Sequence, residues 1–365
     1  MTDRQRVRRI LSEAIEASNG VTLADFMELC LYSPGVGYYE RTLRQVGKEG
    51  DFYTSVSVGS VYGELLGSML ARELKGQSLK TIQIVEAGVH TGQLALDILA
   101  HLERWEPEFF GQVRYLIIEP SSSRRDVQQA SLKQFEGKVA WATGWSDVEE
   151  FEGAVISNEL LDAMPVRSLS RREGAWAERY VIEIDGQLAF EERAVGKQDL
   201  PSSGFLDRLE KEADSLPDGF PLEISPQADA WWQAALGRLR QGILFTADYG
   251  YSEEEWLEGA FPEGTLRGYK DHRQVTDLLF EPGMMDLTAH VNFSELARMG
   301  ELAGFEVVEL DRQGQVLGRI MRDVEEGNAG FPDWTPKRNR QLQTLIFPQF
   351  LGAKFRNLLL KRSCP

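Results

Sequence analysis

Two glycines and two carboxylates in the first third of the chain have the types and spacing of a nucleotide-cofactor site. Gly88 and Gly92 separate an apolar run, which ends at Glu86, from a helical pattern behind them. A glycine-rich turn between a strand and a helix directs backbone N–H groups at a ligand, at the positive end of the helix dipole. Glycine also permits a close approach that a side chain would prevent. The stretch IVEAGVHTGQLALDIL, residues 84–99, therefore predicts a cofactor loop.

The carboxylates indicate which cofactor the loop holds. Glu86 ends the first strand, where it would repel a pyrophosphate and attract an ammonium group. Glu119 ends the next predicted strand, where it can bind both ribose hydroxyls. It lies 119 − 88 = 31 residues beyond Gly88, against ~20 in dinucleotide folds. Both carboxylates fit S-adenosylmethionine, which has an amino group, a ribose and a sulfonium but no phosphate. The alternative is that both residues merely end strands at the solvent.

His90 stands where such loops usually have a middle glycine. If the backbone there needs a positive φ, a residue other than glycine is uncommon, although histidine is tolerated. The side chain could point away from the ligand, occupy the space of its methionine carboxylate, or donate a hydrogen bond to that carboxylate. We expect cofactor binding to be retained, with His90 as part of the loop.

A second polar cluster follows the fourth predicted strand and is the candidate acceptor site. The strand runs into SNELLDAMP, residues 157–165, so Asn158 and Glu159 should face the methyl donor at the carboxyl edge of the sheet. If the chain turns into a helix here, Glu159 and Asp162 share a face. Two carboxylates could then bind a guanidinium by charge-assisted hydrogen bonds. Alternatively, Asp162 caps a turn. After the fifth strand, Tyr249 and Tyr251 either wall an acceptor channel or pack against the insertions.

Strands and helices must position these residues, and they alternate from residue 81 onwards. Apolar runs at 81–87, 113–120, 138–144, 153–159 and 241–251 read as strands with helices between them. Two more strands are expected, one at the end of ELARMGELAGFEVVELDRQG (295–314) and one in KFRNLLLKR (354–362). This order predicts an α/β fold with a doubly wound, mostly parallel, seven-stranded sheet. Ser225 and Pro226 should begin the helix before the fifth strand, and Gly242 should follow its end.

Two insertions and a helical N-terminal region complete the expected organisation. Alternating residues such as WAERYVIEI favour an antiparallel meander, and a later polar segment could form a lid. The expected parts are a helical N-terminal region with a cofactor-covering loop (1–80), a core (81–165, 226–251 and 292–365), the meander (166–225) and the lid-like segment (252–291).

Composition limits the classes of partner and cofactor. The 365 residues carry a net charge of −17, which argues against nucleic acid and anionic membranes as partners. Two cysteines and four histidines show no metal-ligand spacing, so we expect no metal. No run approaches the ~18 apolar residues of a membrane span. The basic residues 1–18 could suggest a transit peptide, but their apolar positions fit one face of a structural helix. A cytoplasmic protein of unknown oligomeric state is expected.

Seven sequence blocks in order resemble the MidA-like methyltransferases of bacteria and mitochondria, one member of which serves respiratory complex I assembly by methylating an arginine. The blocks are FMELCLYSPGVGYY (26–39), GDFYTS (50–55), EAGVHTGQL (86–94), SNELLDAMPV (157–166), ADYGY (247–251), GTLRGYKDHR (264–273) and PGMMDLTAHVNF (282–293).

The resemblance implies a class I methyltransferase fold, Rossmann-like in its core, with S-adenosylmethionine held by Glu86, Gly88, Gly92 and Glu119. It also suggests that the GDFYTS loop, with Asp51 and Thr54, helps to close the cofactor pocket. Two departures lie beside that pocket. The family usually has glycine at the position of His90, and a Pro-Glu pair at Val56-Ser57.

These observations favour a methyltransferase that acts on an exposed arginine of a protein, such as a respiratory-complex subunit. The choice of arginine as the methyl acceptor follows from the resemblance alone. An inactive relative that works as an assembly or binding partner is the second hypothesis, and a small-molecule methyltransferase is the third. An NAD-dependent oxidoreductase is disfavoured by Glu86 and by the spacing to Glu119.

Overall fold

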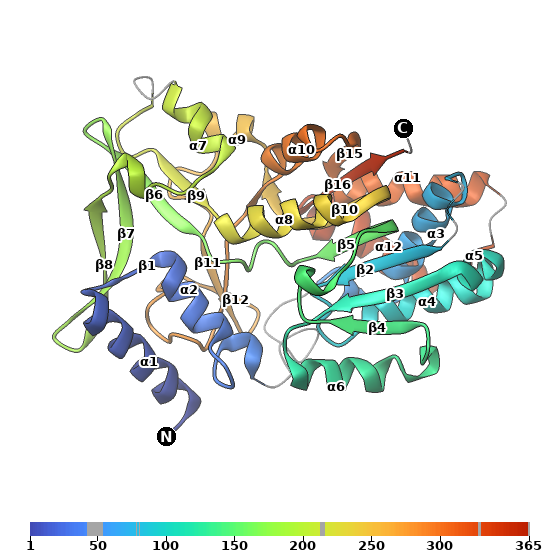
Figure 1. Ribbon diagram of the computed structural model, residues 1–365, viewed down its shortest axis with the longest axis horizontal. Helices are drawn as coiled ribbons and strands as arrows, with labels where there is room; N and C mark the ends of the chain where they lie inside the picture. Colours follow the sequence, from blue (N-terminus) through green and yellow to red (C-terminus); the bar gives the residue numbers. More distant parts are fainter. Residues whose placement is uncertain (42–53, 78, 80, 212–215, 328–329, 364–365) are drawn as a thin grey trace. The chain divides into compact units, whose positions relative to one another are not determined.

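The computed structural model shows two compact units (Figure 1). It describes residues 1–41, 54–77, 79, 81–211, 216–327 and 330–363. Unit 1 gathers Met1–Phe52, Leu161–Ala230 and Tyr251–Glu295, and unit 2 gathers Tyr53–Leu160, Trp231–Gly250 and Leu296–Pro365. Residues 54–77, which we expected with the N-terminal helices, belong to unit 2 because their helix packs against the sheet.

Unit 2 is built on a mixed sheet with the strand order β15-β16-β10-β5-β2-β3-β4. Neighbours from β10 to β4 are parallel, whereas β16 runs antiparallel to both of its neighbours. A doubly wound, mostly parallel sheet is thus confirmed. The strands are β2 (Ile82–Ala87), β3 (Val113–Ile118), β4 (Val139–Ala142), β5 (Phe151–Asn158), β10 (Leu239–Tyr251), β15 (Glu306–Arg312) and β16 (Phe355–Arg362).

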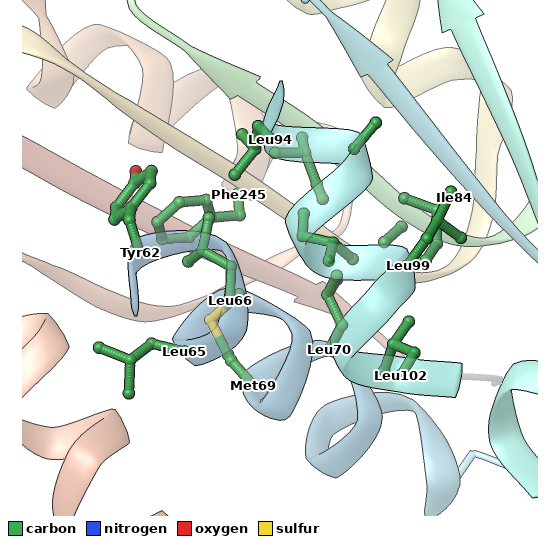
Figure 2. Close-up of a cluster of buried hydrophobic side chains, with 14 of the residues drawn as sticks. Tyr62, Leu65, Leu66, Met69, Leu70, Ile84, Leu94, Leu99, Leu102 and Phe245 are labelled. Atoms are coloured by element: carbon green, nitrogen blue, oxygen red, sulfur yellow. The ribbon is translucent and has the colours of Figure 1, made fainter. Parts of the chain in front are cut away.

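Helices cover this sheet because its strands are apolar on both faces. On β2, Ile84 lies in the main core cluster, while the neighbouring Val85 points to the other face, and both are fully buried. Figure 2 shows α3 and α4 meeting over the first face through Leu66, Leu70 and Leu99. The helices with most residues in unit 2 are α3 (Val61–Lys75), α4 (Gln93–Trp105), α5 (Pro107–Gln112), α6 (Ser122–Ser131), α8 (Pro226–Arg238), α10 (Phe293–Leu302), α11 (Gln313–Glu326) and α12 (Pro336–Ile346).

Gly242 corrects one sequence expectation. Helix α8 ends at Arg238, and Gly242 lies inside β10 opposite Gly153 of β5. A Cβ atom at Gly242 would lie 1.8 Å from the carbonyl oxygen of Gly153, and φ is +130°. The glycine therefore permits close approach of two parallel strands rather than ending a helix.

Unit 1 contains the two N-terminal helices and two small antiparallel sheets. The apolar face of α1 (Asp3–Ser18) is buried through Val7, Leu11 and Ile15, which confirms the structural helix. Thr22 and Asp25 form the predicted capping box of α2 (Leu23–Tyr32). The remaining elements are β1 (Val21–Thr22), β6 (Arg167–Arg172), β7 (Ala175–Ile184), β8 (Gln187–Ala194), α7 (Gly204–Leu209), β9 (Pro221–Ile224), α9 (Glu253–Leu257), β11 (Arg267–Lys270), β12 (Arg273–Val275), β13 (Asp286–Thr288) and β14 (Val291–Asn292).

The segment expected to be lid-like is more regular than its sequence suggests. Strands β11, β12 and β13 form a three-stranded antiparallel sheet. Asp271 and His272 are the two central residues of the β11–β12 hairpin and have φ values of +49° and +59°. Such backbone angles are those of a type I′ turn, which usually contains glycine or asparagine, so residue type did not reveal the hairpin.

Candidate active site

The predicted cofactor loop connects β2 to α4 at the carboxyl edge of the unit 2 sheet. Gly88 and Gly92 have φ values of +77° and +89°, and Gly92 immediately precedes the first residue of α4. A Cβ atom at Gly88 would lie 3.1 Å from the Cβ atom of Leu160, tighter than most such contacts. Both glycines therefore have the left-handed backbone that favours glycine, and at Gly88 the neighbouring Leu160 leaves little room for a side chain. Their close approach to a ligand stays a prediction.

His90 lies between these glycines and shares their left-handed backbone, with φ of +47°. Burial, followed by the nearby Arg124, lowers the pKa of its imidazole to about 4, so the ring is neutral at pH 7. Its Nε2 atom is buried and has no hydrogen-bond partner among the described residues. A buried polar atom without a partner costs about 1–3 kcal/mol, so a ligand group that pairs with it would be favoured here.

Glu86 lies at the end of β2 and is 2% exposed. The hydroxyl group of Tyr115 on β3 donates a hydrogen bond to Oε2 of Glu86. Burial raises the pKa of Glu86 to about 7, although this hydrogen bond opposes the shift. A buried carboxyl group with a pKa near neutrality, next to a glycine loop, is typical of functional sites.

Glu119 follows β3 directly, and its carboxylate is held by two donors. The backbone N–H of Ser121 donates to Oε1 at 3.0 Å, and Nε2 of Gln128 donates to Oε2 at 3.0 Å. Glu119 is 5% exposed, so these bonds hold the carboxylate in one orientation. Because β2 and β3 are paired in parallel, with Ala87 opposite Ile118, Glu119 starts from the same sheet edge as the glycine loop.

The ends of β5 and β10 bring further polar groups to this edge. Asn158 accepts a hydrogen bond from the hydroxyl group of Tyr62 at 2.7 Å. Burial raises the pKa of Tyr62 well above its ordinary value, and the negative charges of Glu159, Asp248 and Glu86 add to the rise. The electrostatic environment of the Tyr62 hydroxyl is therefore set by carboxylates at the ends of three adjacent strands, β2, β5 and β10.

Glu159 has an unusual backbone. Its φ is +51°, in the left-handed region that few residues other than glycine adopt. Its N–H donates to the carbonyl of Ala247 at 2.9 Å, and its Oε1 accepts from Nδ2 of Asn158 at 3.0 Å. The backbone N–H of Ser55 also donates to Oε1, at 3.2 Å. A strained residue whose side chain is fixed by two donors is a candidate for function.

The GDFYTS segment is described only in part, because Asp51 lies outside the described residues. Thr54 and Ser57 exchange hydrogen bonds between backbone N–H groups and hydroxyl groups, each at 3.0 Å. Ser55, fully buried, donates its hydroxyl hydrogen bond to Gln313 at 2.9 Å. The end of this segment therefore packs within unit 2, where the Ser55 N–H donates a hydrogen bond to Glu159.

The other residues predicted for the acceptor site, Asp162, Tyr249 and Tyr251, differ from Glu159 in their contacts. Residues 159–162 form a bend and a turn, so the helical face expected to bring Glu159 and Asp162 together is not formed. Asp162 is 4% exposed in unit 1, where its carbonyl accepts a hydrogen bond from Ala289 at 2.8 Å. Tyr251, 1% exposed, packs against Trp256 with ring centroids 4.4 Å apart. Tyr249 is half-buried, with its ring 4.3 Å from that of Phe355.

Sequence reasoning missed three residues that hold the site together, namely Tyr62, Ser55 and Gln128. Tyr62 and Gln128 lie in helices and have no distinctive neighbours in the sequence. Ser55 acts through its backbone, which no side-chain pattern reveals. Asp248 was noted only within its motif, yet its carboxylate accepts from the N–H groups of Leu160 at 3.2 Å and Tyr249 at 2.9 Å.

The sheet order, the antiparallel β16 and the glycine loop flanked by carboxylates define a class I methyltransferase fold with a nucleotide-cofactor site. The family model described as "Putative S-adenosyl-L-methionine-dependent methyltransferase" matches residues 65–310. The chain belongs to this family, and its cofactor is S-adenosylmethionine.

Two groups of relatives support this placement. The mitochondrial protein arginine methyltransferase NDUFAF7 of Rattus norvegicus is 28% identical over 376 residues, covering 95% of this chain and 82% of the relative. Its Caenorhabditis elegans homologue is 28% identical, covering 80% and 71%. A crystal structure from Burkholderia thailandensis, with bound S-adenosyl-homocysteine, is 26% identical with a TM-score of 0.83, covering 99% of this chain and 92% of that one.

The part of the chain that the structure describes contains no helix long and apolar enough to cross a membrane. Within the same ranges, no cluster of three or more His, Cys, Asp or Glu residues could hold a metal ion. Cys30 is buried and free, whereas Cys364 lies outside the described residues.

Proposed function

We propose that this methyltransferase modifies an arginine side chain of a protein and that Glu159 receives the guanidinium. The relatives named as protein arginine methyltransferases support the choice of acceptor. The observation that carries the proposal is the left-handed Glu159 at the end of β5, whose carboxylate is held by Asn158 and Ser55. A member of respiratory complex I is the substrate that the family resemblance suggests.

The cofactor residues are proposed on the same grounds. Glu119 binds the ribose hydroxyls, Glu86 stabilises the ammonium group, and the loop from Gly88 to Gly92 approaches the methionine part. The unpartnered Nε2 of His90 and the left-handed glycines fit such a ligand. Thr54 supports this region through its contacts with Ser57, and Asp51 remains a prediction.

S-adenosylmethionine supplies an electrophilic methyl group on a sulfonium. Direct displacement needs alignment more than covalent participation by the protein. A guanidinium keeps its proton in water, so a carboxylate must bind it as a cation and stabilise the charge as transfer proceeds. As the new N–C bond forms and the S–C bond breaks, the attacking nitrogen loses one proton to the carboxylate or to water. Glu159 can do both, because its fixed Oε1 leaves the carboxylate in one orientation. Tyr249 is proposed as a wall for the acceptor, whereas the buried Tyr251 is assigned to packing.

Glu159→Gln tests this assignment. We expect kcat/KM for methyl transfer to a protein acceptor to fall by about 100-fold or more, because the carboxylate that binds the guanidinium is lost. The dissociation constant of S-adenosyl-homocysteine should change little. Glu150→Gln, at an exposed glutamate before β5, is the matched control. Retention of full arginine methylation by Glu159→Gln would exclude Glu159 as the acceptor residue.

A catalytically inactive assembly partner is the main alternative, because His90 and Val56-Ser57 depart from the family pattern. The structure favours an active site, since His90 adopts the left-handed backbone that a glycine would supply. Cofactor binding combined with mass spectrometry of methylated arginine separates the two functions. An inactive partner would bind its target without producing a methylated product.

A further inference from the structure

Gln128 is a fully buried amide in contact with two parts of the proposed cofactor site. It lies on α6, whose residues are mostly polar, and it is the buried residue of that helix. Long polar side chains are rarely buried completely unless their hydrogen bonds are satisfied. Its partners therefore indicate what the amide does.

The amide of Gln128 links two parts of the site. Its Nε2 donates to the backbone carbonyl of His90 at 3.1 Å and to Oε2 of Glu119 at 3.0 Å. Its Oε1 accepts a hydrogen bond from Nε1 of Trp141 on β4 at 3.0 Å. An indole N–H can only donate, so Trp141 fixes which end of the amide carries the two hydrogens. Both N–H groups are then directed at the site.

We propose that Gln128 is a positioning residue for the cofactor, because it couples the glycine loop to the ribose carboxylate. One N–H holds the carbonyl of His90, the residue with the strained backbone, and the other holds Glu119. A chain with an apolar side chain at 128 would leave two buried acceptors without this donor. The proposal rests on Glu119 and the His90 loop binding the cofactor, and it does not depend on the acceptor.

Gln128→Met tests the coupling, because methionine has a similar length and no donor. We expect the dissociation constant of S-adenosyl-homocysteine, measured by isothermal titration calorimetry, to rise by about 10- to 100-fold. Gln129→Met, at the exposed neighbour on α6, is the matched control and should bind like the wild type. Wild-type affinity in Gln128→Met would overturn the proposal.

A double-mutant cycle separates positioning from general support of the fold. If Gln128 acts by holding Glu119, its replacement should weaken binding much less in a Glu119→Ala background, which has no acceptor for the amide, than in the wild type. Additive effects of the two substitutions would contradict this role. Unchanged binding in Glu119→Ala alone would instead refute the proposed role of Glu119 as a cofactor ligand, on which this proposal rests.

Gln128→Glu provides a variant of nearly identical shape in case the methionine variant does not fold. Its carboxylate would face Glu119 and the His90 carbonyl, and only its protonated form has an O–H to donate. The dissociation constant of S-adenosyl-homocysteine for Gln128→Glu, divided by that for the wild type, should therefore fall as pH is lowered. A ratio that stays constant with pH would contradict the donor role of the amide.

Discussion

Glu86 should make both stability and cofactor binding depend on pH. Its carboxyl group is 2% exposed, and burial raises its pKa from 4.5 to about 7. The folded protein therefore holds this proton more tightly than the unfolded chain. The stabilising contribution of the protonated group is fully present below the unfolded pKa and is lost as pH rises through about 7.

The size of this effect follows from the pKa shift. A rise from 4.5 to about 7 is about 2.5 pKa units, which corresponds to about 3 kcal/mol at 1.36 kcal/mol per unit. Glu86→Gln removes the ionisation and keeps an acceptor for Tyr115. We expect the free energy of unfolding of Glu86→Gln to exceed that of the wild type at about pH 8 by up to this amount, and to converge with it near pH 4.

Urea unfolding of both proteins across this pH range is the assay, with Glu150→Gln as an exposed control. If the free energy of unfolding depends on pH in the same way in the wild type and in Glu86→Gln, the reasoning is refuted. Binding provides a second test, because the ammonium group of the cofactor favours the ionised carboxylate. The affinity of the wild type for S-adenosyl-homocysteine should fall below about pH 7, with proton release on binding near pH 6, whereas Glu86→Gln should show neither.

Three further predictions concern packing and hydrogen bonding. Gly242→Ala should prevent correct pairing of β10 with β5, because its Cβ atom would collide with the Gly153 carbonyl, and soluble folded protein should be lost. Gly237→Ala, at an open position in α8, should instead stabilise the protein by about 0.5–1 kcal/mol in thermal unfolding. Tyr62→Phe removes the hydrogen bond to Asn158 and should lower the free energy of unfolding by about 1–2 kcal/mol, together with the rate of methyl transfer. An unchanged rate would show that Asn158 does not need Tyr62 for its position.

The position of the glycine loop could be predicted from the sequence because glycine type and strand–helix alternation are local signals, whereas its role as a cofactor site stays a prediction. Gly88 and Gly92 lie between β2 and α4, and Glu119 follows β3, as their order required. The antiparallel β16 could be recognised as a strand, but its place between β10 and β15 depends on pairing across distant parts of the chain. Such pairing has no local signature.

The acceptor side was less predictable for a related reason. The spacing of Glu159 and Asp162 suggested a helix face, but Glu159 adopts a left-handed backbone and the chain bends instead. Gln128 gave no signal because its helix is mostly polar, and only the tertiary structure shows which of its polar residues is buried. Individual buried hydrogen bonds are decided by packing, which periodicity does not encode.

The central claim is that the loop containing His90 is a working cofactor site. Isothermal titration calorimetry of S-adenosylmethionine and S-adenosyl-homocysteine into the wild type and His90→Gly tests it directly. Because His90 already adopts the left-handed backbone that a glycine would supply, we expect the wild type to bind, with a dissociation constant of about micromolar, and His90→Gly to bind equally or more weakly. No binding by the wild type together with binding by His90→Gly would contradict the claim, because the imidazole would then block the site.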